Sequence, residues 1–326
     1  MLKLVLLLIT PLFLFSQGKK VLITGGAGFI GSHLCERLIN NGHTVYCLDN
    51  LHTGNLKNLK EVVDHQNFHF IKQDVVQEIT IDHLDEIYHL ACPASPRHYQ
   101  EDPIKTLKTC FIGALNMLEL AKKTNAKIFF SSTSEIYGDP AIHPQVESYW
   151  GNSNPIGIRA CYDEGKRCAE TLFFDFHRTY NIDIRVGRIF NTYGPRMNPK
   201  DGRVIPNFIN QALQDIPITI YGTGKQTRSY CYVSDLVDAI LLFMESSYPG
   251  PVNLGNPEEY TVLETASIIK QLIDSDSAFI YKELPFDDPQ RRCPDISLAR
   301  KELGYEPKVC FREGLKKTIA YFSEEN

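Results

Sequence analysis

A glycine string between an apolar strand and an amphipathic helix most constrains the fold of this chain. Residues 21–24 form a short apolar run, and Gly25, Gly28 and Gly31 follow it at intervals of three; residues 29–40 then have helical apolar spacing. Gly25 permits a tight turn, Gly28 lets the backbone approach a pyrophosphate, and Gly31 lets the helix pack on the strand. We therefore expect a βαβ unit that binds a dinucleotide at the turn.

Strands and helices continue to alternate through the first half of the chain. The predicted strands are 44–48, 68–71, 87–90, 127–131 and 184–189, and the later predicted helices are 104–123 and about 159–180. This alternation is typical of parallel strands joined by right-handed helical crossovers. The fold class is therefore α/β, a doubly wound parallel sheet of the Rossmann type.

The pattern changes after residue 190, where residues 191–202 hold two prolines and two glycines. Shorter elements follow: strands at 218–221 and 230–233, helices at 205–213, 261–272, 296–303 and 312–322, and a helix capped by Asp235 that runs to about 244. We predict a nucleotide-binding domain at 19–190, to which 230–250 return, and a smaller C-terminal lobe for substrate at 191–326.

The first 18 residues are an apolar leader with Lys3 as the one charge before Lys19. The run is short for a membrane span, which needs about 20 residues, and is closer to a signal-peptide core. It is either a targeting leader or an extension that is removed or idle. No other segment has the apolar length to cross a bilayer, and a secretory or membrane-associated location through residues 1–17 stays open.

Charge and cysteine content narrow the class of protein. The net charge of −5 comes without a basic block, so no nucleic-acid partner is expected. The nine cysteines are scattered and form no CxxC pair, which argues against a disulfide framework and against a metal site. A reducing compartment follows, and we expect a cytoplasmic enzyme.

Asp49 indicates which dinucleotide is bound. It ends the second predicted strand, 24 residues after Gly25, where a carboxylate accepts hydrogen bonds from ribose hydroxyls and repels a 2′-phosphate. Residues 50–54 contain no Arg or Lys to neutralise such a phosphate. NAD is therefore favoured over NADP. Asp74 and Val75, after the third strand, are suitably placed to meet the adenine.

Tyr162 and Lys166 lie four residues apart in a predicted helix, so they project from one face. A cation beside a phenol favours the phenolate, which lets Tyr162 exchange a hydroxyl proton near neutral pH. Such a YxxxK pair is common by chance, but it gains weight beside the glycine turn.

The glycine turn, the SSTSE segment at 131–135 and YxxxK together resemble the extended short-chain dehydrogenases/reductases, in the NAD-dependent epimerase/dehydratase family. Longer segments resemble one branch, the UDP-glucuronate decarboxylases or UDP-xylose synthases, over about residues 19–323. They include PIKTLKTCFIGALNMLELAKK, SSTSEIYGDP, NPIGIRACYDEGKRCAETL, RIFNTYGPRM, YVSDLV, PVNLGNPEEYT and DDPQRRCPDI. The resemblance implies NAD-dependent decarboxylation of UDP-glucuronate to UDP-xylose through a UDP-4-keto sugar, with bound NADH re-reducing C4. It also implies a homodimer packed through the helices at 104–123 and 159–180.

The resemblance assigns catalytic roles beside Tyr162 and Lys166. Thr133 would hydrogen-bond the reacting sugar hydroxyl, Glu135 would lie beside the sugar C5, and Arg292, the second of two adjacent arginines, would meet the substrate carboxylate. Two positions depart from the branch: Cys92 replaces a serine near the cofactor, and Cys293 replaces the usual lysine after the arginine.

The resemblance also implies the binding residues. The expected NAD contacts are Gly25, Gly28, Phe29, Ile30, Gly31, Asp49, Asn50, Thr53, Gly54, Asp74, Val75, Leu90, Cys92, Thr109, Ser131, Tyr162, Lys166 and Thr192. The expected substrate contacts are Tyr99, Lys108, Asn116, Asn191, Arg203, Val204, Phe208, Tyr221, Gln226, Arg228 and Arg292. Val204 and Phe208 fit a core role equally well, and Lys108 also fits a solvated helix face.

Three other functions compete with the decarboxylase. A 4,6-dehydratase is expected to carry Thr-Asp-Glu where this chain has Thr133, Ser134 and Glu135. A 4-epimerase needs neither Glu135 nor the arginine segment near 292. A non-catalytic NAD-binding regulatory module would not require Thr133, Tyr162 and Lys166 together.

Overall fold

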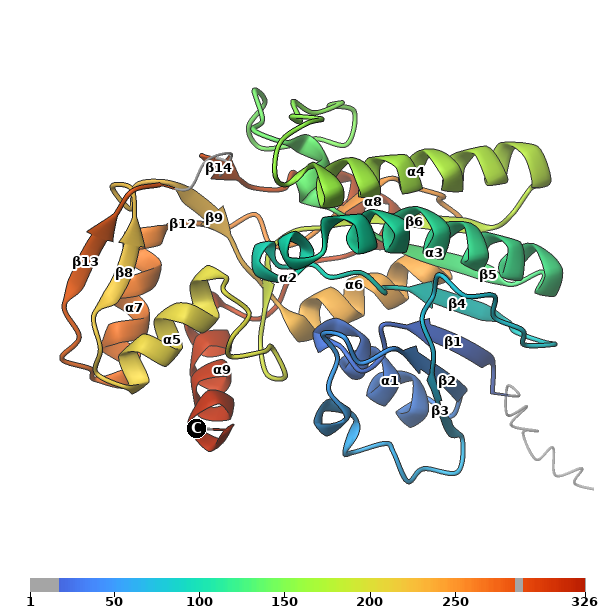
Figure 1. The fold of residues 1–326 in the computed structure, drawn as a ribbon, viewed down its shortest axis with the longest axis horizontal. Helices are drawn as coiled ribbons and strands as arrows, with labels where there is room; N and C mark the ends of the chain where they lie inside the picture. The colour runs from blue at the N-terminus through green and yellow to red at the C-terminus, as the bar shows by residue number, and fades with distance from the viewer. Residues whose placement is uncertain (1–17, 285–289, 326) are drawn as a thin grey trace, which may run out of the picture.

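Seven parallel strands form the central sheet of the structure, a computed structural model that describes residues 18–284 and 290–325. The sheet order is β11-β6-β5-β4-β1-β2-β3 (Figure 1). Its strands are β1 (Lys20–Thr24), β2 (Thr44–Asp49), β3 (Phe68–Lys72), β4 (Glu86–His89), β5 (Lys127–Thr133), β6 (Ile184–Ile189) and β11 (Val252–Leu254). The first strand, β1, lies inside the sheet; β2 and β3 follow on one side of it, and β4, β5 and β6 follow on the other. The strand order therefore reverses between β1 and β4, and the Rossmann-type prediction is confirmed.

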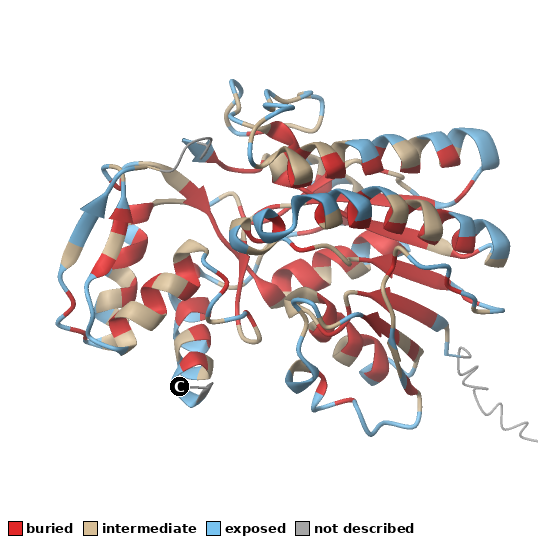
Figure 2. Ribbon diagram, viewed as in Figure 1, coloured by how far each residue is buried: buried red, intermediate tan, exposed pale blue. Residues whose placement is uncertain are grey.

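Helices cover both faces of this sheet (Figure 1). One layer holds α2 (Pro96–Glu101), α3 (Pro103–Thr124) and α4 (Ala160–Tyr180); the other holds α1 (Phe29–Asn40), α6 (Val233–Glu245) and α8 (Ser297–Leu303). Side chains of β1 alternate between the two layers: Val21 and Ile23 belong to the same apolar cluster as Ile240, whereas Leu22 packs with Met117. Figure 2 shows β4, β5, β6 and β11 largely buried, as expected for a parallel sheet covered on both sides, whereas the edge strand β3 is partly exposed.

A smaller lobe lies beyond the carboxyl ends of the strands (left in Figure 1). Its helices are α5 (Val204–Leu213), α7 (Val262–Ile273) and α9 (Phe311–Glu325). Its strands are β8 (Ile218–Tyr221) paired with β13 (Phe279–Lys282), and β9 (Thr227–Ser229) between β12 (Glu259–Thr261) and β14 (Arg291–Arg292). The pair β7 (Thr192–Tyr193) and β10 (Cys231–Tyr232) lies where the chain crosses between lobes, and 3₁₀ turns occupy η1 (Leu56–Leu59) and η2 (Ser134–Tyr137).

Two sequence expectations for this region need correction. Asp235 does not cap α6, because Tyr232 is the N-cap residue; instead the Asp235 carboxylate accepts the backbone N–H groups of Lys308 and Val309. The strand β11 was not predicted, because three residues are too few to show alternation; its pairing with β6 creates it. Since α6 packs on α1 and β6, residues beyond 190 do return to the sheet, while the proposed domain boundaries stay a prediction.

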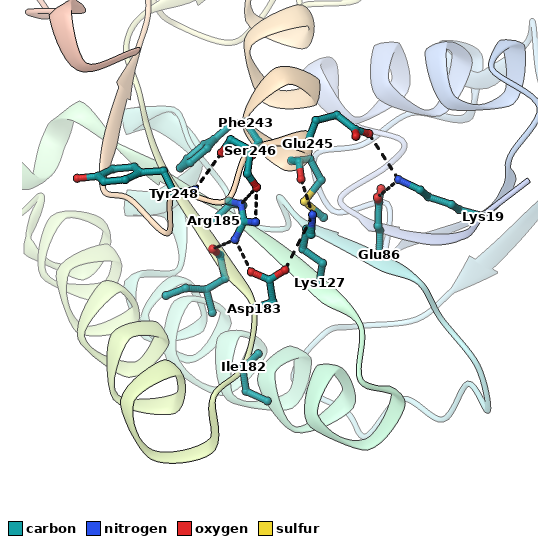
Figure 3. Close-up of polar contacts among 12 residues, drawn as sticks. Lys19, Glu86, Lys127, Ile182, Asp183, Arg185, Phe243, Glu245, Ser246 and Tyr248 are labelled. Carbon is teal, nitrogen blue, oxygen red and sulfur yellow. Dashed lines mark hydrogen bonds and ion pairs between the residues drawn. The ribbon is translucent and has the colours of Figure 1, made fainter. Parts of the chain in front are cut away.

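The amino ends of the strands are tied to the end of α6 (Figure 3). Lys19 Nζ lies 2.5 Å from Glu86 Oε1, and Lys127 Nζ donates to the carbonyl of Met244 at 2.9 Å. The buried Arg185 donates through Nε to the carbonyl of Ser246 at 2.9 Å. Cations therefore satisfy the last carbonyls of α6, where the helix dipole favours positive charge.

The predicted apolar leader at 1–18 lies almost wholly outside the described residues, as do residues 285–289 at the start of the arginine segment. Among the helices that the structure describes, none is both long and apolar enough to span a membrane.

Candidate active site

A cavity of about 1030 Å³ opens at the carboxyl ends of the strands, between the sheet and the smaller lobe. Parallel sheets bind ligands at this edge, beside the point where the strand order reverses. Every expected NAD contact lines the cavity, and so do the expected substrate contacts Tyr99, Asn191, Arg203, Val204, Phe208, Tyr221, Gln226 and Arg228. Residues from distant parts of the sequence thus meet around one space of dinucleotide and substrate size.

Three expected substrate contacts, Lys108, Asn116 and Arg292, do not line this cavity; Arg292 lines a smaller one described below. Lys108 is exposed on α3, and the side-chain amide of Asn116 donates to the carbonyl of Val75 at 2.8 Å, so it holds a loop instead. The α3 lysine that lines the cavity is Lys105, one helical turn earlier, which pairs with Asp74. The resemblance assigned Lys108 instead and did not name Lys105.

The glycine turn has the geometry that its sequence predicts. Gly25 has φ of +72°, a left-handed conformation that suits glycine. A Cβ on Gly31 would lie 2.2 Å from the Gly25 carbonyl oxygen, so only glycine lets α1 begin so close to β1. Gly28 is the N-cap residue of α1 and provides no side-chain cap. The first N–H groups of α1 therefore suit a pyrophosphate.

Asp49 lies buried at the end of β2 and faces the cavity. Its carboxylate accepts the backbone N–H groups of Ala27 at 3.0 Å and Leu51 at 2.8 Å. Burial raises the pKa of Asp49, although these two donors act in the opposite direction. The carboxylate thus orders the glycine turn and also faces the place of a ribose, so the residues present fit NAD.

Asp74, expected near the adenine, belongs to a polar group at the same end. It pairs with Lys105 and accepts from the Asn50 amide at 2.9 Å. Burial would raise the pKa of Asp74, but Lys105, the Val76 backbone N–H and the Asn50 amide together outweigh it, and the pKa is lowered. Its carboxylate is therefore an acceptor at neutral pH.

Tyr162 and Lys166 are both buried on α4, but they do not touch as the YxxxK spacing suggests. Lys166 Nζ donates to the Ser131 carbonyl at 2.7 Å and lies 5.9 Å from the centre of the Tyr162 ring. Burial raises the pKa of Tyr162 well above its ordinary value, although a hydrogen bond from Thr133 lowers it. Burial is thus the largest effect on the pKa of Tyr162, and the proton exchange expected of Tyr162 near neutral pH stays a prediction.

Tyr99 packs against Tyr162. The two rings are stacked with centres 5.1 Å apart and planes within 3°. The Tyr99 hydroxyl is buried and has no hydrogen-bond partner among the described residues, although Tyr99 lines the cavity. It therefore both fixes the Tyr162 ring and offers a polar atom to a ligand.

Glu135 lies between two arginines. It pairs with Arg159 and lies 3.3 Å from Arg292 Nη2, while Arg292 Nη1 donates to the Ser134 carbonyl at 2.8 Å. Burial would raise the pKa of Glu135, but the guanidinium groups of Arg292 and Arg159 lower it to about 2. Glu135 is thus a carboxylate at neutral pH, which excludes it as a resting proton donor.

Sequence reasoning missed Arg159 and Asp163. Asp163 is 8% exposed; its Oδ2 lies 3.9 Å from Arg159 Nε, and its Oδ1 has no hydrogen-bond partner among the described residues. Burial and the charge of Glu135 raise the pKa of Asp163 to about 8, against the effect of Arg159. Their spacing from Tyr162 was the available signal, since Arg159 lies one helical turn before it and Asp163 directly after it.

These residues surround a second, smaller cavity of about 70 Å³, which shares Glu135 and Arg159 with the large one. Arg292 lines this smaller cavity, is 1% exposed, and keeps Nε buried with no hydrogen-bond partner in the described chain. Arg292 therefore offers a buried, charged donor that suits an anionic group of a ligand.

The far end of the large cavity carries further arginines. Arg203 is held by Asp201 at 2.5 Å, and Arg228 donates to the Thr227 carbonyl at 2.8 Å. Tyr221 is partly exposed at the rim, and its carbonyl accepts from Gln226 at 2.7 Å. This end therefore offers cations and an aromatic ring to a nucleoside diphosphate. In the described part of the chain, no three His, Cys, Asp or Glu side chains group as a metal site.

Comparisons with known proteins agree with this geometry. Residues 21–255 match the NAD dependent epimerase/dehydratase family. UDP-glucuronic acid decarboxylase 6 of Arabidopsis thaliana is 55% identical over 302 residues, 92% of this chain and 88% of the relative. UDP-glucuronic acid decarboxylase 1 of Danio rerio is 55% identical over 307 residues, 94% of this chain and 73% of the relative.

Solved structures share the whole fold. UDP-glucose 4-epimerase of Thermotoga maritima, solved with UDP-glucose, has a TM-score of 0.87 at 33% identity and covers 94% of this chain and 99% of its own. UDP-glucuronic acid 4-epimerase of Bacillus cereus, solved with UDP-glucuronic acid and NAD, has a TM-score of 0.83 at 26% identity and covers 94% and 100%.

Proposed function

The chain belongs to the NAD-dependent epimerase/dehydratase family, and we propose that within it the chain is an NAD-dependent UDP-glucuronate decarboxylase that forms UDP-xylose. The observation that carries the proposal is Arg292 in the Glu135–Arg159–Arg292 cluster: it is buried, and its Nε has no hydrogen-bond partner in the described chain, so it suits a sugar carboxylate. A neutral hexose would not supply an anionic acceptor for that donor. The names of the relatives supply the substrate, and the cluster supplies the physical reason for it.

The first step needs a base at the C4 hydroxyl. Bound NAD supplies a hydride acceptor that can return the hydride later, and its nicotinamide ring adds a positive charge. Tyr162 takes the hydroxyl proton, Thr133 holds the Tyr162 oxygen by a hydrogen bond, and Lys166 stays fixed on the Ser131 carbonyl. Because burial raises the pKa of Tyr162, nearby positive charge is needed to reach the phenolate.

The second step loses carbon dioxide. Oxidation at C4 gives a β-keto acid, whose electrons delocalise onto the C4 oxygen when the C5 carboxylate leaves. Thr133 and Tyr162, which both line the cavity, donate hydrogen bonds to that oxygen as charge develops. Arg292 orients the carboxylate, and Glu135, as an anion, holds both arginines and positions a water that reprotonates C5.

A 4-epimerase is the second candidate, because a UDP-glucuronic acid 4-epimerase shares the fold. The test incubates the protein with NAD and UDP-glucuronate, measures carbon dioxide, and identifies the sugar by NMR, with Tyr162→Phe as the inactive control. Carbon dioxide and UDP-xylose support the proposal. The C4 epimer without carbon dioxide contradicts it in favour of the epimerase, and NAD binding without turnover contradicts it in favour of a regulatory module.

We also propose a homodimer packed through α3 and α4. The exposed apolar side chains Ile104, Leu107 and Phe111 lie three and four residues apart and form one stripe on α3. Such a stripe is the usual mark of an interface. A cytoplasmic location is proposed on the nine cysteines, all free thiols in the described chain.

A further inference from the structure

Two thiols, the half-buried Cys92 and the buried Cys110, lie next to Tyr162 and Lys166. Cys92 follows β4, Cys110 lies on α3, and their sulfur atoms are 3.3 Å apart. The residues are 18 positions apart in the sequence, so the fold brings them together. Neither role assigned to the site so far, cofactor contact or helix packing, needs a second sulfur at this distance.

The two thiols differ in reactivity. The hydrogen bond from Cys110 lowers the pKa of Cys92; burial opposes this, and the Lys166 ammonium adds to the lowering. The same hydrogen bond and burial raise the pKa of Cys110 well above its ordinary value. Cys92 also lines the large cavity, so a small reagent can reach it, whereas Cys110 lies behind it. A thiolate in contact with solvent and a thiol behind it is the arrangement of a reactive and a resolving cysteine.

We propose that hydroperoxides oxidise Cys92 and that Cys110 then closes a disulfide with it, which reversibly inactivates the enzyme. In the first step the Cys92 thiolate attacks a peroxide oxygen, the O–O bond breaks, and a sulfenic acid and hydroxide form. In the second step the Cys110 sulfur attacks the sulfenic sulfur, the S–O bond breaks, and the hydroxyl leaves with the Cys110 proton as water. The two cysteines are oxidised by two electrons and one peroxide is reduced.

Disulfide formation must move Cys92 rather than Cys110. A disulfide needs the sulfurs to close from 3.3 Å to about 2.0 Å. Cys110 is wedged against α4, because a Cβ on Gly165 would already lie 3.0 Å from the Cys110 Cβ. The segment that carries Cys92 therefore shifts toward α3. Because residues 90–96 line the cavity beside Tyr162, the shift removes cofactor contacts and stops turnover.

The other thiols of this region do not offer the same pair. Cys161 contacts the Tyr99 carbonyl at 3.5 Å, and burial raises its pKa. Cys168, on the same helix, is exposed and serves as a matched control. The proposal rests on the proposed function only for the activity readout.

The test treats the NAD-bound protein with hydrogen peroxide and follows turnover, intact mass and peptide mapping. We expect the loss of two hydrogen atoms, a peptide that links Cys92 to Cys110, and a loss of turnover equal to the linked fraction. Dithiothreitol should restore both. Cys168→Ser should behave as the wild type.

Cys110→Ser decides the role of the resolving thiol, with Cys110→Ala as a second variant if the first does not fold. Either variant should turn over normally before treatment. After treatment we expect no linked peptide, a sulfinic acid on Cys92, and inactivation that dithiothreitol does not reverse. A wild-type protein that forms no linked peptide, or a variant whose activity recovers like the wild type, overturns the proposal. Because the mass readout does not depend on which sugar nucleotide reacts, a failure of the proposed function would be seen separately.

Discussion

At the scale of single residues, Glu135 and Asp163 lie on either side of Arg159 yet carry opposite protonation states. Glu135 meets two guanidinium groups, and its pKa falls to about 2, whereas Asp163 lies 3.9 Å from one of them and its pKa rises to about 8. Burial acts on both carboxyls in the same direction, so the number and closeness of cations decides between them. One acid therefore supplies charge and the other holds a proton.

Asp163→Asn tests that protonated state through stability. The folded pKa of Asp163, about 8, lies above its ordinary value of 3.8, so it destabilises the folded state increasingly as pH rises from about 4 to about 8. Asparagine cannot ionise. The stability of Asp163→Asn relative to wild type should therefore increase across that window, measured by thermal unfolding at several pH values. Asp175→Asn, exposed on the same helix, is the control; a pH-independent difference for Asp163→Asn would show that Asp163 is ionised throughout.

Arg292→Ala separates the two chemical steps. Arg292 is the buried arginine beside Glu135, and we expect its loss to lower carbon dioxide release by about 10²-fold, the size of a lost buried charged contact. Oxidation at C4 should suffer less, so reduced cofactor should accumulate and be visible by its absorbance. Arg291→Ala, the exposed neighbour, is the matched control. Normal carbon dioxide release from Arg292→Ala would remove the assigned role.

Asp49→Ala tests the choice of cofactor. Asp49 lines the cavity, and we propose that it meets the ribose and repels a 2′-phosphate, so its loss should weaken NAD binding and bring the NADP and NAD affinities closer together. Binding is measured for both cofactors by titration calorimetry. Because Asp49 also holds the N–H groups of Ala27 and Leu51, Asp49→Asn is the variant that keeps part of that loop contact. Unchanged discrimination in both variants would rule out the ribose assignment.

At the scale of elements, α3 serves two surfaces. Its inner face carries Thr109 and Cys110 beside the cavity, and its outer face carries the stripe of Ile104, Leu107 and Phe111. A dimer through this helix would therefore fix one wall of the active site. The helix begins at a defined point, since the Asp102 side chain accepts the N–H of Lys105 and Pro103 opens the first turn.

Leu107→Asp tests the interface. Leu107 is 46% exposed, so an aspartate there costs the monomer little, but it would bury a charge in a dimer. We expect a monomer by light scattering coupled to size exclusion, with the wild type a dimer and Lys122→Asp, at the other end of α3, unchanged. A variant that stays dimeric places the interface elsewhere.

At the scale of the whole molecule, the two ends of the sheet strands have different roles: one end lines the cavity, and the other holds contacts that stabilise the fold. The cavity lies at the carboxyl ends, and the ties of Lys19, Lys127 and Arg185 lie at the amino ends (Figure 3). Arg185→Met leaves the Ser246 carbonyl without its donor, which should cost about 1–3 kcal/mol of unfolding free energy by urea titration. Turnover per folded molecule should not change, and Arg178→Met, exposed on α4, should lose little stability. An equal loss of stability in both variants would show that the contact between Arg185 and the Ser246 carbonyl does not specifically stabilise the fold.

The sequence predicts those parts of this molecule whose signal is local. The glycine turn, Asp49 and the Tyr162–Lys166 pair each lie within one element or at its end, and the structure places all of them on the cavity. Contacts between segments that lie far apart in the sequence could not be predicted from local patterns. Glu135 and Arg292 are 157 positions apart, and only the family resemblance indicated that both belong to the site. The raised pKa of Tyr162 likewise depends on burial, which no spacing reveals.

The arginine cluster has a consequence for how a reaction cycle ends. UDP-glucuronate brings one more negative charge than UDP-xylose, and that charge departs with the carbon dioxide. Glu135 stays beside Arg292 and Arg159, while Arg292 Nε loses the acceptor that the ligand supplied. Product affinity should accordingly fall less with ionic strength than substrate affinity does. Loss of the carboxylate would thus weaken binding of the sugar, and decarboxylation would itself favour release of the product.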